Sequence, residues 1–567
     1  MFSLLRNMRI CFMSPGACRQ RHLPGFREYS DYRKMGNATQ DTGKIARSAG
    51  KVSIAVMCSR VLGLVREQVF AALFGAGFAY DAFVVAFRIP NLLRDLFGEG
   101  ALSAAFVTVF TDYDTNKEPA ATWKLANNVL TFIAILLSFI TLAGMFCADS
   151  ILAVLAPDFA LIADKMELTR NMTVIMFPFL IFISLSSVVM GILNSKGHFF
   201  VPAMASSFFN LGSIVGGLSL AFIMPRFGQP PIVGMAFGTL VGGLLQLSIQ
   251  FPSLQKAGFS FRPHLNLNDP GLRRVLFLMV PAIIGLSATQ VNIFINTYFA
   301  AACSQGSVSW LSYAFRLVHL PVGLFGVALS VASLPVIARH AASGDMDSLK
   351  EAYATSLTMA FCLTVPATVG LLFLAEPIIR VIFEHGAFTS DDTSMTAQAL
   401  IYYSLGLFAY AAVKITVPVF YALHDTRYPV MGSFLAVAAN IVIILLTIDA
   451  FQHRAIALST SCAMTINFLF LFVILYRKIA GYPLAAIAAG LVKILLASGI
   501  MGGFLLVAKR ATASFAAGGL LQDMTVVLLL VAGGTAVYGI SLAVLGLREM
   551  NLIVDKLKGL LSHGVGR

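Results

Sequence analysis

Eight charged side chains lie between residues 60 and 99 of one long apolar stretch of this chain, residues 59–113. Four are arginines and four are acids: Arg60, Arg66, Glu67, Asp81, Arg88, Arg94, Asp95 and Glu99. The two apolar segments that carry them are long enough to cross a membrane, and ionisable groups at that depth usually face a protein interior or a water-filled path. Arginine does not lose its proton to escape the cost of burial. The stretch therefore predicts a hydrated, positively charged cavity inside a membrane protein.

The spacing of the arginines suits a phosphate ligand. Arg60 and Arg66 are six residues apart, and Arg88 and Arg94 repeat this spacing in the next segment. A guanidinium group can donate two parallel hydrogen bonds to a phosphate, and these bonds are stronger in a cavity of low dielectric constant than in water. Two or three converging arginines would therefore suit a diphosphate.

An alternative reading assigns these arginines to structure alone. Arg66 would pair with Asp81 or Glu67, and Arg94 would pair with Glu99, so that the pairs only join two helices. This alternative is weakest for the arginines that lie deepest within their segments. These are Arg60, Arg88 and, further along the chain, Arg316.

The second segment also contains residues that predict a bend. Pro90 removes a backbone hydrogen bond in mid-segment, and Gly98 and Gly100 follow it. The bend would let the segment move as the cavity opens and closes. Close packing against a neighbouring helix explains the same residues equally well.

Other polar residues are secondary candidates. Glu99 could contribute to the cavity, and so could Lys414, whose long side chain could equally reach a backbone carbonyl. Glu384 and His385 form the only acid–base pair suited to an enzyme in the short loops of one face, and a surface turn explains that pair better.

The composition of the whole chain indicates a membrane protein. Of 567 residues, 58% are hydrophobic and 12% are charged, and the mean hydropathy of +0.83 is far above that of a soluble protein of this size. The net charge of +13 fits basic loops beside anionic headgroups, so we expect no nucleic-acid partner. The seven cysteines are scattered without CxxC pairs, and we expect neither a metal site nor a cofactor.

Fourteen apolar segments of about 18 residues or more follow residue 45. They lie near 46–74, 79–108, 125–147, 168–193, 202–224, 231–251, 274–301, 307–338, 349–373, 393–422, 429–449, 455–476, 486–508 and 523–547. Lysines and arginines crowd both tails and the loops of one face, so the positive-inside rule places both termini in the cytoplasm. The basic tail 1–45 is expected to be disordered, and the tail 548–567 to form an amphipathic helix on the inner surface.

The second and eighth segments are copies of one another. AFRIPNLLRDLFG, which starts at Ala86, aligns without gaps to AFRLVHLPVGLFG, which starts at Ala314, at an offset of 228 residues. Arg88 therefore corresponds to Arg316. The positions that correspond to Arg60, Arg66 and Arg94 are uncharged: Ala288, Phe294 and Val322. We infer that the first half supplies most of the positive charge and the second half supplies one equivalent arginine.

The repeat predicts the fold class. An even number of spans separates the copies, so the two halves share one topology, with a substrate site expected between them. We expect an all-α integral membrane protein with fourteen transmembrane helices. Two six-helix lobes, 46–255 and 272–480, would surround a central cavity, and two additional helices would follow over 486–547.

Long motifs in the chain resemble the MviN/MurJ family of lipid II flippases. They include SRVLGLVREQ, DAFVVAFRIPNLLRDLFGEGALSAAFVTVF, NSKGHFFVPA and KITVPVFYALHDTRYPV, and the resemblance covers nearly everything after residue 46. It implies the fold of the multidrug/oligosaccharidyl-lipid/polysaccharide exporters, in which the two extra helices form a lipid groove. It also implies essential roles for Arg60, Arg66, Asp81, Arg94 and Arg316. Phe315 stands where many relatives have an acid, so we expect Arg316 to lack an ion pair and to be free to meet phosphate.

The resemblance further implies a transporter rather than an enzyme. Its substrate would be undecaprenyl-diphosphate-linked disaccharide-pentapeptide, carried from the inner to the outer leaflet of the bacterial cytoplasmic membrane by alternating access, for peptidoglycan synthesis. Other expected partners are membrane lipids and, as a candidate, the cell-wall synthesis machinery, and we expect a monomer. Competing hypotheses are an exporter of drugs or other lipid-linked glycans, and a membrane enzyme acting on the same lipid.

Overall fold

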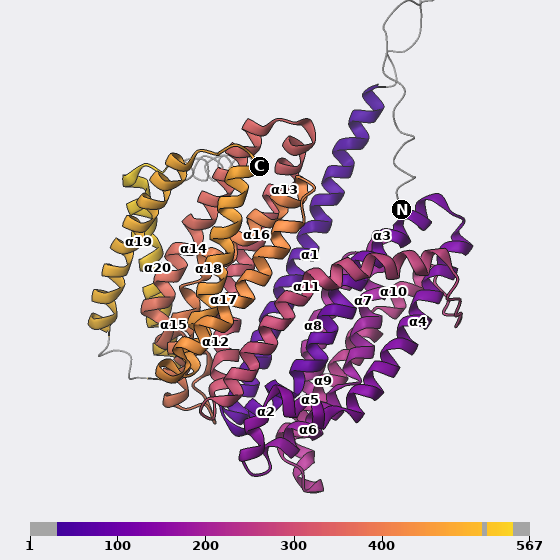
Figure 1. Cartoon of the computed structure of the whole chain (residues 1–567), viewed down its shortest axis with the longest axis horizontal. Coiled ribbons are helices and arrows are strands. Elements are labelled where there is room, and N and C mark those ends of the chain that lie inside the picture. Colours follow the sequence, from indigo (N-terminus) through magenta and orange to yellow (C-terminus); the bar gives the residue numbers. More distant parts are fainter. Residues whose placement is uncertain (1–30, 513–518, 548–567) are drawn as a thin grey trace, which may run out of the picture. The chain divides into compact units, whose positions relative to one another are not determined.

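The computed structural model describes residues 31–512 and 519–547, with side chains from Val52 onward except that of Glu99, and every described element is a helix (Figure 1). The chain divides into two units, Met1–Ile54 and Ala55–Arg567. Helix α1 (Asp31–Phe74) runs across this division and begins at Asp31 rather than near residue 46. The other parts of the predicted tails, residues 1–30 and 548–567, lie outside the described residues.

Among the described residues, eleven helical segments are long and apolar enough to cross a membrane, or twelve if a bent pair forms one span. The eleven are α4 (Pro119–Phe146), α6 (Lys165–Met176) with α7 (Phe179–Ser195), α8 (Phe200–Ile223) with η3 (Met224–Phe227), α9 (Pro231–Ser248) with α10 (Phe251–Lys256), α11 (Pro270–Ala302), α12 (Ser307–Pro321) with η4 (Val322–Val327) and α13 (Ala328–Ser343), α14 (Met346–Phe383), α17 (Arg427–Phe451), α18 (His453–Lys478), α19 (Leu484–Thr512) and α20 (Leu520–Leu545). The bent pair is α15 (Ser390–Ser404) and α16 (Leu407–Ala422). The first two predicted spans correspond to α1 and to α2 (Phe78–Arg94) with η1 (Asp95–Gly100) and α3 (Ala101–Asn116), which hold the charged stretch.

Two π-helices interrupt the second and eighth predicted spans at matching places. η1 follows α2 directly, and η4 follows α12 directly, so their first residues differ by 227 positions, close to the repeat offset. The predicted bend at Pro90 therefore takes another form: α2 continues through Pro90, and the helix changes at Asp95–Gly100, a segment that contains Gly98 and Gly100. Single π-helical turns inside α-helices often mark functional positions.

Gly100 leaves no room for a side chain. A Cβ at this position would overlap the Asp95 carbonyl oxygen and would lie 2.6 Å from Leu286 Cδ1 of α11. We expect Gly100→Ala to lower the free energy of unfolding by about 1–3 kcal/mol, since backbone and a neighbouring helix must both move. Thermal unfolding of the detergent-purified protein measures this effect. Gly539→Ala, in α20 with nothing within 4 Å of the added carbon, is the matched control and should not destabilise; equal losses in both variants would contradict the expectation.

The core of the Ala55–Arg567 unit consists of three apolar clusters. One joins α3, α4, α7 and the first turns of α11. A second joins α14, α16 and α18 with the additional helices α19 and α20. The third joins α2, α6 and α9, from the first half of the chain, to α12, α14 and α15 from the second. Helix α11 contacts α3 of the first half and α17 of the second half, and in Figure 1 it runs obliquely between the two sets of helices.

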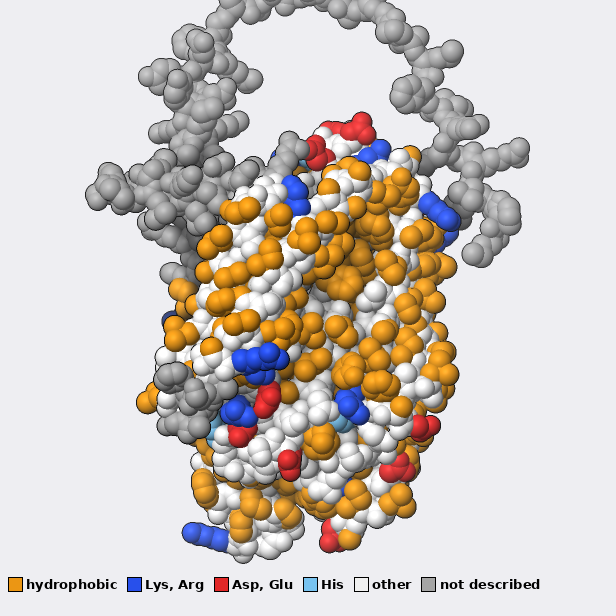
Figure 2. All heavy atoms as spheres, turned by 90° about the vertical axis from the view of Figure 1, so that its left-hand side faces the viewer, with side chains coloured by type: hydrophobic (Ala, Val, Ile, Leu, Met, Phe, Trp, Pro, Cys, Tyr) orange, Lys and Arg blue, Asp and Glu red, His pale blue; other side chains and the backbone are white. Residues whose placement is uncertain are grey.

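The two halves are joined where α1 ends and α2 begins, and we call this region the closed end. Ala387, in the loop between α14 and α15, donates its N–H to the Ala72 carbonyl at 2.8 Å. Two glycines with positive φ, Gly75 at 61° and Gly386 at 63°, allow the two turns to approach backbone to backbone. The Tyr313 hydroxyl of α12 donates to the Gly75 carbonyl at 3.2 Å. Apolar side chains predominate over the face of α19 and α20, with charged groups gathered above and below (Figure 2).

Candidate functional site

Two adjoining hollows occupy the region between α2 and α12. The first, which we call the arginine hollow, has a volume of about 440 Å³ and lies among helices of the first half. The second, which we call the neutral hollow, has a volume of about 310 Å³ and lies among helices of the second half. Both hollows are lined by Arg88, Ser312 and Arg316, which therefore form their common wall. The repeat-related arginines thus lie at one place, on α2 and α12.

Four of the predicted arginines line the arginine hollow: Arg66, Arg88, Arg94 and Arg316. Arg60 does not. It is exposed, and its guanidinium lies against Gly323 of η4, where an added Cβ would come within 2.5 Å of Arg60 Nη1. The structure therefore does not bring Arg60 together with the arginines that line the arginine hollow. Arg60 lies where α1 approaches η4, outside both hollows.

Arg316 has an ion pair, contrary to the expectation from Phe315. Its Nη1 lies 3.0 Å from Glu67 Oε1, and the same oxygen lies 3.0 Å from Arg66 Nη2. The Tyr80 hydroxyl donates to the other oxygen, Glu67 Oε2, at 2.6 Å. Only 3% of the Glu67 side chain is exposed. This carboxylate links α1, α2 and α12 and holds two guanidiniums at the edge of the arginine hollow.

The remaining arginines of the hollow differ in their partners. Arg94 donates to the Asp95 carboxylate at 2.8 Å, and the side chain of Glu99, the other expected partner, lies outside the described residues. Arg88 forms no ion pair with a described carboxylate, and its buried Nε has no hydrogen-bond partner there. Among the side chains that the structure describes, four guanidiniums therefore face two carboxylates, Glu67 and Asp95. The excess positive charge suits an anionic group, because an unsatisfied buried donor is costly and a phosphate oxygen would satisfy it.

Asp81 lies at the closed end rather than in the hollow. The residue is 1% exposed, and its carboxylate forms an ion pair with the buried Lys165 of α6 at 3.1 Å. It also accepts hydrogen bonds from the backbone N–H groups of Gly306 and Ser309 at 2.8 and 2.9 Å, and from the Ser309 hydroxyl at 2.6 Å. These donors belong to the first turn of α12 and the residue before it, so Asp81 caps a helix of the other half of the chain.

The other candidate residues that the structure describes do not line either hollow. Lys414 is exposed and lines neither. Gly98 lies against Ser184 of α7, where an added Cβ would be 3.3 Å from the hydroxyl. Glu384 accepts a hydrogen bond from Thr393 at 2.6 Å, and His385 Nε2 lies 3.1 Å from the Val381 carbonyl. Both residues of the pair considered for an enzyme are thus engaged by the adjoining helices, Glu384 by α15 and His385 by α14.

Sequence reasoning did not single out three residues that shape this site. Lys165, the partner of Asp81, lies 84 residues from it. Phe209 of α8 lies under Arg66, with its ring centroid 5.3 Å from the guanidinium carbon, and Tyr80 orients Glu67. Of these three, only Tyr80 lies inside the charged stretch. Its hydroxyl group, placed among charged residues, could have marked it as a site residue. Lys165 and Phe209 have no distinguishing pattern.

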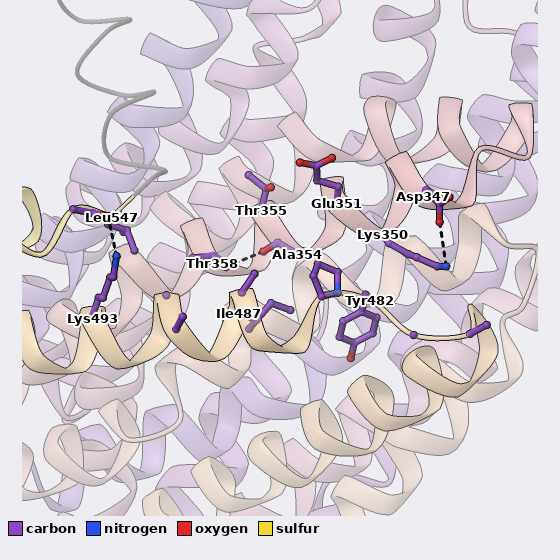
Figure 3. Close-up of a pocket in the computed structure, with 17 residues that line it drawn as sticks. Asp347, Lys350, Glu351, Ala354, Thr355, Thr358, Tyr482, Ile487, Lys493 and Leu547 are labelled. Atoms are coloured by element: carbon purple, nitrogen blue, oxygen red, sulfur yellow. Dashed lines mark hydrogen bonds and ion pairs between the residues drawn. The ribbon is translucent and has the colours of Figure 1, made fainter.

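A larger hollow of about 1030 Å³ lies elsewhere, between α14, α19 and the segment 480–483 (Figure 3). Lys350, Lys493, Asp347 and Glu351 surround a floor of small residues. Lys493 donates to the Gly546 carbonyl at 2.9 Å, and Lys350 approaches Asp347 at 3.4 Å. None of the predicted site residues lines it, and its amines and carboxylates balance, so it does not offer the excess positive charge of the arginine hollow.

A fourth hollow is almost entirely apolar. It has a volume of about 360 Å³ and lies between α12, η4, α14, α19 and α20. Pro321, Phe325, Leu371, Met501 and Leu530 are among the residues that line it. It therefore adjoins the π-helix that follows α12, on the side where the two additional helices pack.

Comparison with known proteins agrees with this arrangement. The family model described as "Lipid II flippase MurJ" matches residues 70–525. A protein of Buchnera aphidicola subsp. Acyrthosiphon pisum named "Probable lipid II flippase MurJ" is 37% identical over 427 residues, which are 75% of this chain and 83% of that protein. A solved structure, "Lipid II flippase MurJ, inward closed conformation", matches with a TM-score of 0.71 at 28% identity and covers 87% of this chain and 98% of its own. An inward-facing multidrug transporter of the MATE family shares the fold alone, with a TM-score of 0.63, 15% identity, and coverage of 76% and 98%. The chain therefore belongs to the lipid II flippase MurJ family, whose members are multi-pass transporters of the bacterial inner membrane.

Proposed function

We propose that this protein carries lipid II from the inner to the outer leaflet of the bacterial cytoplasmic membrane. The observation that carries the proposal is the common wall of the two hollows, where Arg88 and Arg316 come together from repeat-related helices. A diphosphate needs several converging cationic donors, and arginine provides them without losing its charge. Family membership supplies the substrate, since the relatives are named as lipid II flippases.

The lipid tail and the headgroup require different surroundings. The headgroup carries phosphates and carboxylates and needs a wet, positive cavity, for which the arginine hollow is suited. The prenyl tail need not enter that cavity. We propose that it stays in the membrane and follows the apolar hollow between η4, α14, α19 and α20.

Alternating access would require the closed end to separate. Asp81, Lys165 and the first turn of α12 would hold this end shut, and η1 and η4 would let α2 and α12 bend as the halves rotate. Pro90, Gly98 and Gly100 contribute to this bending. With a cytoplasmic N-terminus, α1 would run outward, so the closed end, where α1 ends, would lie on the outer side of the membrane. The excess of lysine and arginine in the loops of one face supports cytoplasmic termini and fourteen spans.

We place the lateral entrance where α1 approaches η4. Arg60 is exposed there and would meet the diphosphate before it reaches Arg88 and Arg316. Glu99 and Lys414 remain secondary candidates near this path. The two lobes, 46–255 and 272–480, with the additional helices over 486–547, are the bodies proposed to move. Membrane lipids are the surrounding partners, and we propose that the protein acts as a monomer beside the cell-wall synthesis machinery.

Depletion of the protein in its native cell tests the proposal. Lipid II should accumulate in the inner leaflet, because its synthesis continues while its transfer stops. The leaflet distribution is measured by the accessibility of lipid II to an enzyme added from outside the cytoplasmic membrane. A normal distribution of lipid II with altered sensitivity to drugs would favour the second candidate, an exporter of drugs or of other lipid-linked glycans.

A further inference from the structure

The neutral hollow differs in chemistry from the arginine hollow, although the two share a wall. Apart from Arg88 and Arg316 in that wall, the lining residues of the neutral hollow carry no formal charge when His319 is neutral. They combine aromatic rings with hydroxyl and amide groups, on Phe315, Tyr403, Thr297 and Asn296. A ligand group that fits this lining is polar but uncharged and presents apolar C–H faces.

Aromatic rings form one side of this hollow. The rings of Phe315 and Tyr403 are 5.5 Å apart between centroids, in an edge-to-face arrangement, and the rings of Phe315 and His319 are 4.2 Å apart. An aromatic face carries partial negative charge and attracts the C–H groups of a flat, saturated ring. A sugar offers such C–H groups on its faces and hydroxyl groups at its edges.

Outside the shared wall of Arg88, Ser312 and Arg316, two polar side chains of the hollow have no hydrogen-bond partner among the described residues. His319 Nε2 is buried without a hydrogen bond. The Tyr403 hydroxyl makes none either, although the residue is only 4% exposed. Asn296, by contrast, is engaged: it donates to Thr460 at 3.0 Å and accepts from Asn440 at 2.7 Å. Tyr403 and His319 are therefore the groups available to bind a ligand hydroxyl or amide.

We propose that the neutral hollow is the sugar subsite, in which the uncharged amino-sugar part of the headgroup lies while Arg88 and Arg316 hold the diphosphate. The proposal rests on the proposed function. The first sugar of lipid II is joined to the diphosphate and bears both the peptide and the second sugar, so the headgroup branches close to the phosphates. Two hollows that meet at a cationic wall match this branching: the sugars would enter the neutral hollow, and the carboxylate-bearing peptide would enter the arginine hollow. The volume of about 310 Å³ is at the lower end for ligand pockets, as a partial headgroup requires.

Binding of two ligands to the full-length protein in nanodiscs tests this subsite. Lipid II carries the sugars, and undecaprenyl diphosphate has the same tail and phosphates without them. Tyr403→Phe removes one hydroxyl and should weaken lipid II binding by about 2- to 13-fold, the effect of one lost neutral hydrogen bond. It should leave the affinity for undecaprenyl diphosphate unchanged. Phe315→Leu, which removes a ring face, should show the same selectivity.

Two further variants make the outcomes distinguishable. Tyr402→Phe alters the neighbouring residue, which lines neither hollow and packs edge-to-face against Phe451, and should not change either affinity. Arg316→Ala should weaken the binding of both ligands. If Tyr403→Phe and Phe315→Leu weaken both ligands equally, or weaken neither, the sugar subsite is overturned while the diphosphate site stands. If the unaltered protein binds lipid II no better than a phospholipid, the proposed function itself fails.

Discussion

Arg88→Ala should abolish complementation of a strain depleted of the protein, while the variant still inserts into the membrane. Arg88 is the guanidinium in the common wall that has no described carboxylate partner, so its hydrogen-bonding capacity is free for the diphosphate. Hydrogen bonds to a charged group contribute roughly 1.5–3 kcal/mol, which corresponds to about 10- to 150-fold in the affinity for lipid II. Binding in nanodiscs and growth of the depleted strain give the two readouts.

Arg170→Ala is the matched control for this substitution. Unlike Arg88, Arg170 forms an ion pair, with Asp149 at 2.8 Å, and its side chain is 48% exposed and lines neither hollow. Surface pairs of this kind contribute little, so growth and binding should be unchanged. Normal growth of a strain that carries only Arg88→Ala would show that the wall arginine is structural and would contradict its assignment to the diphosphate.

Asp81→Asn should open the closed end. Lys165 would lose its partner while it remains buried, and removal of one member of a buried ion pair typically costs about 3–5 kcal/mol. The first turn of α12 would also lose the negative charge at its N-terminus. We expect a lower unfolding temperature and greater labelling of a cysteine introduced at Ser307, which is fully buried in the first turn of α12, by a membrane-impermeant reagent.

The double substitution Asp81→Asn with Lys165→Met separates charge from shape. Methionine fills much of the volume of lysine without a charge that needs a partner, so the double variant should recover part of the lost stability. The labelling of the cysteine should remain raised, because α12 still lacks its carboxylate. If labelling of the cysteine in the double variant falls back to the level of the unaltered protein, the closure depends on the ion pair alone and not on the hydrogen bonds between Asp81 and α12.

The repeat made part of the site predictable. Arg88 and Arg316 occupy equivalent positions in two copies of one motif, and copies that fold alike place equivalent residues about a common axis. The two helix interruptions follow the same repeat, since Leu-Phe-Gly recurs within η1 and η4, but the sequence predicted a bend only in the second span, at Pro90. The family assignment was also available from long motifs, and the comparisons confirm it.

The orientation of α1 was not predictable from spacing. Residues six apart on an α-helix point about 120° away from each other, so Arg60 and Arg66 cannot both face one hollow unless the helix runs along it. Arg66 faces the hollow and Arg60 faces η4. Arg88 and Arg94 have the same spacing and both line the hollow, because α2 runs along it from Tyr80 to Arg94. Packing of neighbouring helices, and not the spacing itself, decides between these outcomes.

The partners of the charged groups depended on contacts between distant parts of the chain. The absence of an acid at Phe315 suggested an unpaired Arg316, yet Glu67 of α1 supplies the carboxylate from the other half of the chain. Asp81 looked like a cavity residue because it opens the second span, but Lys165 and α12 enclose it at the closed end. A single sequence gives the charges of such residues but not which helix lies opposite each of them.

A structure of the full-length protein with bound lipid II tests the central claim most directly. Both phosphates should lie within about 2.7–2.9 Å of guanidinium nitrogens of Arg88 and Arg316, at the wall shared by the two hollows. A diphosphate bound instead by Lys350 and Lys493, in the large hollow beside α19, would contradict the assignment of the wall arginines to the substrate.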